Sequence, residues 1–363
     1  MNAGASDGAR TVLIVAGGTG GHIFPALAFR QWIERERKAE RITCLSGSRP
    51  LEAEIYASRG VVPERLFLSG SPLGSSSILK NLWRVLEFFL AFFRAGRLMR
   101  RLRPDRCYLF GGYISLAPLL WCRILKIPTV IHEQNACAGK ATRLASRMGV
   151  PVAAGWKECR GLKVPFVTTG IPVRRFSWMN RRDAARALGI EVQEDDLVIG
   201  VIGGSLSSAA LNALSEKLFR SRKETSPEKL RPLVFAILGD SSGPVPGASV
   251  HFLGRRWDMS PFYSLVDAVI CRSGASTLAE LALYGIPALT IPWKDAADGH
   301  QEANARCFAA ISENLVWYEE ENTGPEDAFS KLLTLCLRKK TPRGEISADD
   351  RASRTLWKMG TEL

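Results

Sequence analysis

The sequence lacks the short motifs that mark the common metal and nucleotide sites. It has no His-Glu-x-x-His, no Cys-x-x-Cys and no Asp-x-Asp, and it contains four histidines in 363 residues. Because metal ions in proteins are bound by clustered His, Cys and carboxylate groups, we expect neither a metal nor a cofactor. No glycine loop ends in Gly-Lys-Ser/Thr, and no Gly-x-Gly-x-x-Gly follows a predicted strand. These absences disfavour a Walker-type NTPase and a dehydrogenase.

Long hydrophobic runs are also missing. The uncharged run 197–215 has 19 residues, but Gly203-Gly204-Ser205 interrupts it, which is typical of a strand, a loop and a helix rather than of a bilayer span. The first 11 residues contain no hydrophobic export segment, and the eight cysteines lie mostly in apolar segments. We therefore expect reduced thiols in a cytoplasmic protein that is either free or bound to a membrane surface.

Acidic residues are scarce in the first half of the chain. Residues 1–175 carry 27 Lys and Arg against 11 Asp and Glu, whereas residues 176–363 carry 22 against 25. A basic half is typical of a protein that binds a nucleic acid, an anionic membrane or a phosphorylated substrate. The basic residues cluster with apolar ones, and no nucleic-acid recognition motif is present, so we expect no nucleic-acid partner.

Short apolar runs alternate with helical patterns throughout the chain. The run 11–16 (TVLIVA) is apolar on both faces, as in a central parallel strand. Further strands are expected at 41–45, 106–110, 128–132, 164–168, 197–202, 233–238, 249–253, 268–271 and 288–291. The alternation predicts an α/β fold with two doubly wound, Rossmann-like parallel-sheet domains that face each other across a cleft. We place the domains at 11–172 and 173–345, followed by a C-terminal tail or helix at 346–363.

A glycine-rich loop follows the first predicted strand of each half. The first loop, GGTGGH (17–22), opens a helix whose amino end carries about half a positive charge. Such a loop lets a phosphate or a sugar approach the backbone closely. The second loop, GGS (203–205), has the equivalent position, but no charged residue follows it closely.

Polar residues follow other predicted strands. HEQN (132–135) and GGY (111–113) each lie at a strand end, where ligands of parallel sheets bind. In CRSGAST (271–277), hydroxyls and amides open a helix that carries Glu280. The spacing of Thr277 and Glu280 fits a helix-capping box as well as it fits a diphosphate site with a ribose-binding carboxylate.

Residues 78–103 form a segment that is both basic and apolar. It holds seven Lys and Arg and one Glu, with apolar side chains at helical spacing. A core-facing helix with a solvated basic face is the simpler interpretation, but the apolar content exceeds one core stripe. We favour a helix that lies on an anionic membrane surface.

Taken together, these motifs resemble the MurG family, the peptidoglycan N-acetylglucosaminyltransferases of glycosyltransferase family 28. GGTGGH, GGYIS, HEQN, TGIPVR, GGS, CRSGAST-x-x-E and HQ-x-x-N-A occur in that family's order over about residues 11–340. The resemblance implies a GT-B fold and a metal-independent, inverting transfer of N-acetylglucosamine from UDP-N-acetylglucosamine (UDP-GlcNAc) to the C4 hydroxyl of the lipid-linked muramyl pentapeptide, lipid I. It also implies a role in cell shape and division at the cytoplasmic face of the inner membrane, with other cell-wall synthesis proteins as candidate partners.

The resemblance implies roles for single residues as well. His22 is expected to act as the base, because an imidazole, which titrates near pH ~6.5, can accept the acceptor's proton at neutral pH. Glu133 is the rival base or orients the acceptor, and Tyr113 contacts the acceptor. Arg174 meets the diphosphate and Glu280 the ribose. The full set of implied substrate-binding residues is Thr19, Gly20, Gly21, Asn135, Arg174, Ser205, Asn212, Arg256, Ala275, Ser276, Thr277, Leu278, Ala279, Glu280, Gln301 and Asn304.

The chain departs from the family pattern at several positions. The family's GGSQGA is GGSLSS here, with Leu206 in place of a polar Gln, and Leu116 stands where a glycine is usual. Two alternatives therefore stay open. One is a related GT-B transferase with another glycolipid acceptor, such as a diacylglycerol, and the other is a catalytically silent UDP-sugar-binding scaffold.

Overall fold

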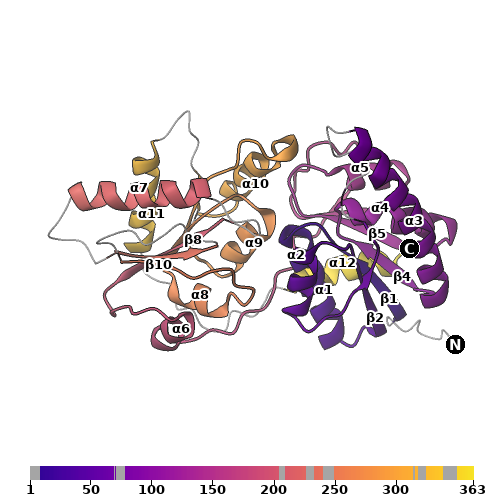
Figure 1. Cartoon of the computed structure of the whole chain (residues 1–363), viewed down its shortest axis with the longest axis horizontal. Coiled ribbons are helices and arrows are strands. Elements are labelled where there is room, and N and C mark those ends of the chain that lie inside the picture. Colours follow the sequence, from indigo (N-terminus) through magenta and orange to yellow (C-terminus); the bar gives the residue numbers. More distant parts are fainter. Residues whose placement is uncertain are drawn as a thin grey trace. The chain divides into compact units, whose positions relative to one another are not determined.

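The computed structural model of the chain describes residues 9–68, 70, 78–203, 209–225, 233–239, 249–313, 315–317, 324–337 and 350–363. These residues divide into two compact units (Figure 1). The first unit holds the residues up to Arg174 together with the last helix of the chain, and the second unit begins at Arg175.

The first unit is built on a seven-stranded parallel sheet with the order β3-β2-β1-β4-β5-β6-β7. Its strands are β1 (Ala9–Val15), β2 (Ala39–Ser46), β3 (Glu64–Arg65), β4 (Arg106–Leu109), β5 (Thr129–Glu133), β6 (Val152–Ala154) and β7 (Val167–Thr168). Its helices are α1 (Gly20–Arg35), α2 (Pro50–Ala57), α3 (Ile78–Leu102), the 3-10 helix η1 (Tyr113–Ser115), α4 (Leu116–Ile124), α5 (Lys140–Arg147) and α12 (Arg351–Thr361). β1 takes a central place because its apolar residues 12–15 are fully buried on both faces of the sheet.

The second unit has a six-stranded parallel sheet with the order β10-β9-β8-β11-β12-β13. Its strands are β8 (Leu197–Ile202), β9 (Leu233–Leu238), β10 (Ser249–Phe252), β11 (Ala268–Cys271), β12 (Ala288–Thr290) and β13 (Leu315–Trp317). Its helices are α6 (Arg181–Leu188), α7 (Ala209–Thr225), α8 (Ser260–Leu265), α9 (Ala275–Leu283), the 3-10 helix η2 (Ala297–Gly299), α10 (His300–Ala309) and α11 (Pro325–Leu337). Its first strand in the chain, β8, is again fully buried and central.

Both sheets have the 3-2-1-4-5 strand core of the Rossmann fold, which confirms the prediction of two Rossmann-like parallel-sheet domains. In each unit the loop after the first strand (β1 or β8) therefore lies at the carboxyl edge of the sheet, next to the loop after the neighbouring strand (β4 or β11). This is the edge at which such sheets bind ligands.

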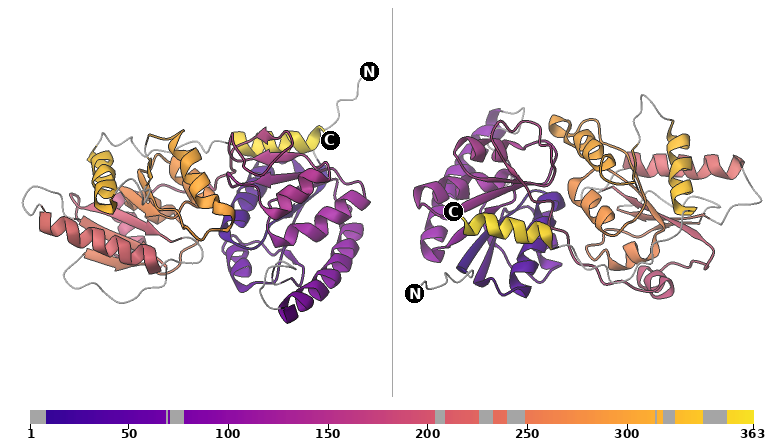
Figure 2. Two further views of the ribbon diagram at one scale, coloured as in Figure 1. Left: turned by 90° about the horizontal axis from the view of Figure 1, so that it is seen from above. Right: turned by 180° about the vertical axis from the view of Figure 1, so that it is seen from behind.

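The end of the chain is part of the first unit. Helix α12 lies against that unit (Figure 2, yellow) and buries Leu356 and Trp357. The hydroxyl of Tyr108 on β4 donates to the carbonyl of Trp357 at 3.2 Å, and Arg35 pairs with Asp350 at the start of the helix. Burial of the two large side chains contributes roughly 1.5–3 kcal/mol each.

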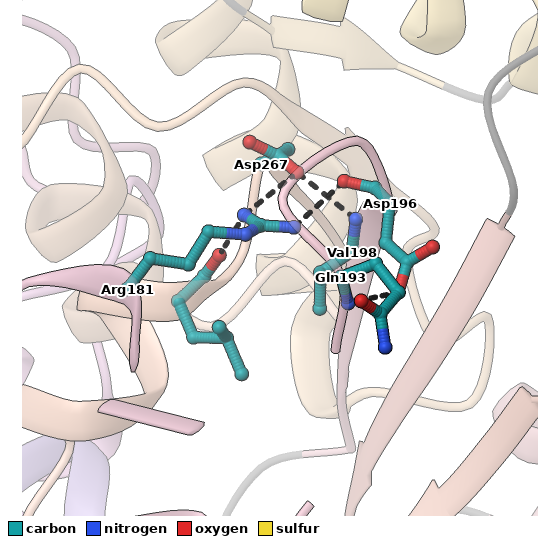
Figure 3. A network of polar contacts seen from close by, with 6 residues as sticks. Arg181, Gln193, Asp196, Val198 and Asp267 are labelled. Carbon is teal, nitrogen blue, oxygen red and sulfur yellow. Dashed lines mark hydrogen bonds and ion pairs between the residues drawn. The ribbon is translucent and has the colours of Figure 1, made fainter. Parts of the chain in front are cut away.

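A buried polar network fixes the start of β8 in the second unit (Figure 3). Arg181 donates to the carbonyl of Asp196 at 2.6 Å and pairs with the carboxylate of Asp267 at 3.4 Å. The same carboxylate accepts from the amide of Val198 at 2.9 Å. Because Asp267 is buried, these hydrogen bonds and the ion pair hold its carboxylate in place at the start of β8.

Candidate active site

The GGTGGH loop joins β1 to α1 and places His22 in the first turn of that helix. Gly18 has a φ of +99°, a left-handed conformation that favours glycine, and Thr19 is the N-cap of α1. The half-buried imidazole of His22 lies against the glycine loop after β4 (Gly111 and Gly112), since a Cβ atom added at Gly111 would be 3.3 Å from the ring. The amides of the first turn and the imidazole therefore share one end of the helix, where the helix dipole favours a negative ligand.

Tyr113 begins η1, directly after Gly111 and Gly112. Its hydroxyl donates to the carboxylate of Glu52 at 2.6 Å, and the guanidinium of Arg49 lies 4.6 Å from the centre of its ring. Burial first, and then the hydrogen bond and charge of Glu52, raise the pKa of Tyr113 above its usual value of 10. Tyr113 therefore stays a neutral phenol that can donate a hydrogen bond.

The HEQN segment has a largely internal set of partners. The Nε2 atom of His132 lies 2.8 Å from the carbonyl of Gly170, and its Nδ1 atom lies 3.0 Å from the side-chain nitrogen of Gln134. These partners fit a neutral ring that donates from Nε2 and accepts at Nδ1, in agreement with burial, which lowers the pKa of His132 to about 4. His132 thus attaches β5 to Gly170, which lies shortly before the chain enters the second unit.

Glu133 binds its own loop. Its carboxylate accepts from the amide of Asn135 at 3.0 Å, the amide of Gly139 at 2.9 Å and the hydroxyl of Thr142 at 2.6 Å. Both oxygens of the buried carboxylate are engaged at the start of α5. This geometry favours His22 over Glu133 as the base and gives Glu133 the task of shaping the loop that carries Asn135.

Arg174 is the last residue of the first unit before the chain enters the second unit, and it is only 5% exposed. Its guanidinium lies 3.7 Å from the centre of the ring of Phe24 on α1. The charge predicted to meet a diphosphate thus lies beside the helix that carries His22.

In the second unit, the loops after β11 and β12 are tied to each other. The hydroxyls of Ser273 and Thr290 are 2.7 Å apart, and the side-chain amide of Asn304 donates to the carbonyl of Ser273 at 3.0 Å. Gln301 accepts from the amide of Trp293 at 2.9 Å. Asn304 is fully buried, so it holds the turn before α9.

Glu280 does not belong to a helix cap. Helix α9 begins at Ala275 with Gly274 as its N-cap, so Thr277 lies inside the helix and the capping-box alternative is wrong. Instead, the hydroxyl of Tyr263 donates to the buried carboxylate of Glu280 at 2.8 Å. This fixes the acid in the second turn of α9.

The remaining predicted residues differ in how they are placed. Thr19, Gly20 and Gly21 surround the start of α1, and residues 275–279 form the first turns of α9, with Leu278 fully buried. The side chain of Arg256 donates to the carbonyls of Leu253 and Leu188, the last residue of α6. Asn212 is buried on α7, and Ser205 lies outside the described residues.

Sequence reasoning missed Glu52 and Tyr263, which hold predicted site residues. Glu52 shares the buried face of α2 with Ile55 and Tyr56. An acidic residue in an apolar stripe at i, i+3 and i+4 is a signal that could have identified it, because unpaired carboxylates are almost never buried. Tyr263 shows no such local signal.

Helix α3 has two apolar faces. Its inner face buries Ala91, Ala95, Leu98 and Met99. Its outer face carries five large side chains that are 50–66% exposed, namely Trp83, Leu86, Phe89, Leu90 and Phe93. The exposed arginines of the same helix include Arg94, Arg97 and Arg101. Within the described ranges, no helix is both long enough and apolar enough to cross a membrane.

Comparisons with known proteins show which proteins the chain is similar to. Residues 12–153 match the glycosyltransferase family 28 N-terminal domain, and residues 198–355 match the C-terminal domain of the same family. The chain is 34% identical over 313 residues to a Pseudomonas putida protein named UDP-N-acetylglucosamine--N-acetylmuramyl-(pentapeptide) pyrophosphoryl-undecaprenol N-acetylglucosamine transferase, covering 84% of this chain and 83% of the relative. A protein of the same name from Ectopseudomonas mendocina is 34% identical over 311 residues, covering 82% of each. Among solved structures, MurG of Acinetobacter baumannii aligns with 98% of this chain and 100% of its own, with a TM-score of 0.66 and 26% identity.

Proposed function

Because the chain belongs to glycosyltransferase family 28, we propose that it transfers N-acetylglucosamine from UDP-GlcNAc to lipid I, the undecaprenyl-diphospho-N-acetylmuramoyl pentapeptide of peptidoglycan synthesis. The observation that carries the proposal is that both halves match the two domains of this family in order, together with relatives of that named activity over more than four fifths of the chain. The product is lipid II.

In the proposed reaction, His22 takes the proton of the C4 hydroxyl of the acceptor sugar. The hydroxyl oxygen then forms a bond to the anomeric carbon of N-acetylglucosamine. The bond from that carbon to the diphosphate breaks, and UDP leaves with the electron pair, so the configuration is inverted. The placement of His22 at the start of α1, beside the glycine loops after β1 and β4, supports this role.

The charge of the departing UDP needs to be balanced. We assign this to Arg174 and to the backbone amides that open α1 and α9, without a metal ion. Glu280, held by Tyr263, would accept hydrogen bonds from the ribose hydroxyls, and Gln301 would contact the sugar. Preorganised donors of this kind stabilise developing negative charge because they need no reorientation during the reaction.

The acceptor is carried by a lipid, so the enzyme has to meet a membrane. We propose that the outer face of α3 lies on the anionic surface of the inner membrane, on its cytoplasmic side. The exposed aromatic side chains would enter the interface, while the exposed Arg97 would pair with anionic lipid headgroups. This arrangement would place the first unit beside the acceptor.

The direct test is release of UDP from UDP-GlcNAc with lipid I present, with diacylglycerol in its place, or with no acceptor. We expect release with lipid I alone, together with formation of lipid II. Release with diacylglycerol alone would show a different glycolipid transferase. Tight UDP-GlcNAc binding with no release under any condition would show a silent scaffold, and either result would refute the proposal.

A further inference from the structure

Glu52 is a buried carboxylate that joins three separate loops. It lies in the first turn of α2 and is 1% exposed. One of its oxygens, Oε1, accepts from the amide of Gly18 at 2.7 Å and from the hydroxyl of Tyr113 at 2.6 Å. The other oxygen accepts from the hydroxyl of Ser46 at 2.9 Å.

The donors come from the carboxyl ends of three neighbouring strands. Gly18 follows β1, Ser46 ends β2, and Tyr113 follows β4. The chain leaves room for this arrangement at Gly47, where an added Cβ atom would lie 2.1 Å from the hydroxyl of Tyr113 and 2.7 Å from the carboxylate of Glu52. Glu52 therefore lies at the point where the loops of three adjacent strands meet.

Two of these loops form the surroundings of His22. A Cβ atom added at Gly112 would lie 2.7 Å from the carbonyl oxygen of Gly17, so the two glycine loops meet backbone to backbone. The His22 ring contacts both, because added Cβ atoms at Gly111 and Gly18 would lie 3.3 and 3.8 Å from it. One loop is bound to Glu52 through Gly18 and the other through Tyr113.

We propose that Glu52 is a positioning residue that fixes the glycine loops after β1 and β4 relative to each other and so sets the position of the His22 imidazole. Its consequence for catalysis rests on the proposed function, in which His22 is the base. A carboxylate suits the role because it has only acceptor atoms, and one oxygen can accept two hydrogen bonds. The relative position of the two loops depends on whether Oε1 extends far enough to accept hydrogen bonds from both.

Two conservative variants separate reach from charge. Glu52→Gln keeps Oε1 for Gly18 and Tyr113, and its amide group can donate to Ser46, so we expect nearly unchanged turnover. Glu52→Asp keeps the charge but draws the carboxylate back by about one carbon–carbon bond, roughly 1.5 Å. A misplacement of about 1 Å in an active site lowers turnover by about 100-fold, so we expect a loss of that size in kcat with unchanged KM for UDP-GlcNAc.

Matched controls test whether the effect is specific. Glu54 is an exposed carboxylate on the same helix, and Glu54→Asp and Glu54→Gln should leave kcat unchanged. Tyr108→Phe removes another buried hydrogen bond of the first unit, that to Trp357, and should lower the melting temperature without lowering kcat. Unchanged kcat in Glu52→Asp, or a loss in Glu52→Gln equal to that in Glu52→Asp, would overturn the proposal.

A second measurement does not depend on transfer activity. The chain has four histidines, so the ring C–H signals in an NMR spectrum can be assigned with single His variants. We expect Glu52→Asp to move the His22 signals and leave those of His251 and His300 unchanged, whereas Glu54→Asp should move none. Unmoved His22 signals in folded Glu52→Asp protein would refute the positioning role, whereas absent transfer by the wild-type enzyme would refute only the proposed function.

Discussion

The outer face of α3 gives a prediction whose size can be worked out. Replacing Phe89, Phe93 and Arg97 together by Ser should release the protein from anionic vesicles. The two phenylalanines are 54% and 66% exposed, so each has more than half of its surface left to bury. Full burial of such a side chain stabilises by roughly 1.5–3 kcal/mol, which leaves about 1–2 kcal/mol for each ring. One arginine near an anionic surface adds about 1 kcal/mol.

The three terms together come to about 4 kcal/mol, or a roughly 1000-fold weaker partition into the membrane. Cosedimentation with vesicles of rising anionic lipid content measures this partition, and added salt should weaken only the arginine contribution. Ile311→Ser is the matched control, because Ile311 is as exposed as Phe93 but belongs to the second unit. If the triple variant partitions like the wild type, α3 is not the membrane-binding element and the reasoning fails.

Three further predictions concern single residues. His22→Ala should lower kcat by about 100-fold or more with UDP binding unchanged by calorimetry, and unchanged turnover would remove His22 as the base. Because the pKa of His132 is lowered to about 4 in the folded state against about 6.5 when unfolded, its contribution to stability is complete above pH 6.5. Up to roughly 3 kcal/mol of it is lost as the pH falls to 4; urea unfolding at several pH values should show a smaller acid loss in His132→Gln, and an equal loss in both proteins would contradict this. Tyr263→Phe should weaken UDP binding about tenfold but leave binding of 2′,3′-dideoxy-UDP, which lacks both ribose hydroxyls, unchanged. Tyr284→Phe, which loses a bond from the amide of Phe176, should change neither affinity, and equal effects of Tyr263→Phe on both nucleotides would disprove its action through Glu280.

The parts of the fold that local patterns encode were predictable. The apolar run 11–16 predicted β1, because a strand buried on both faces is continuously apolar. The glycine loop after that strand then gave the position of His22 at the start of a helix. By contrast, β3, β6 and β13 contain only two or three residues each. Segments of that length have no period of their own, so only their neighbours in the sheet define them.

The predicted site residues differ in the same way. Motifs predicted His22 and Glu280 as site residues because their chemistry is local to a loop or a helix start. The residues that hold them are not local, since Glu52 lies 34 residues from Gly18 and 61 from Tyr113. Sequence spacing carries no information about such contacts. The same limit explains Glu133, whose binding to its own loop is visible only in three dimensions.

The position of α12 has a consequence for biosynthesis. The first unit is translated first, yet the helix that covers Tyr108 and Trp32 is made only after the whole second unit. At about 5–20 residues per second, the intervening stretch takes on the order of ten seconds or more to synthesise. During that time the nascent amino-terminal sheet exposes aromatic surface, so chaperones should bind it until α12 has been synthesised. For the same reason, a fragment truncated at Arg174 should aggregate unless the missing helix is supplied as a peptide.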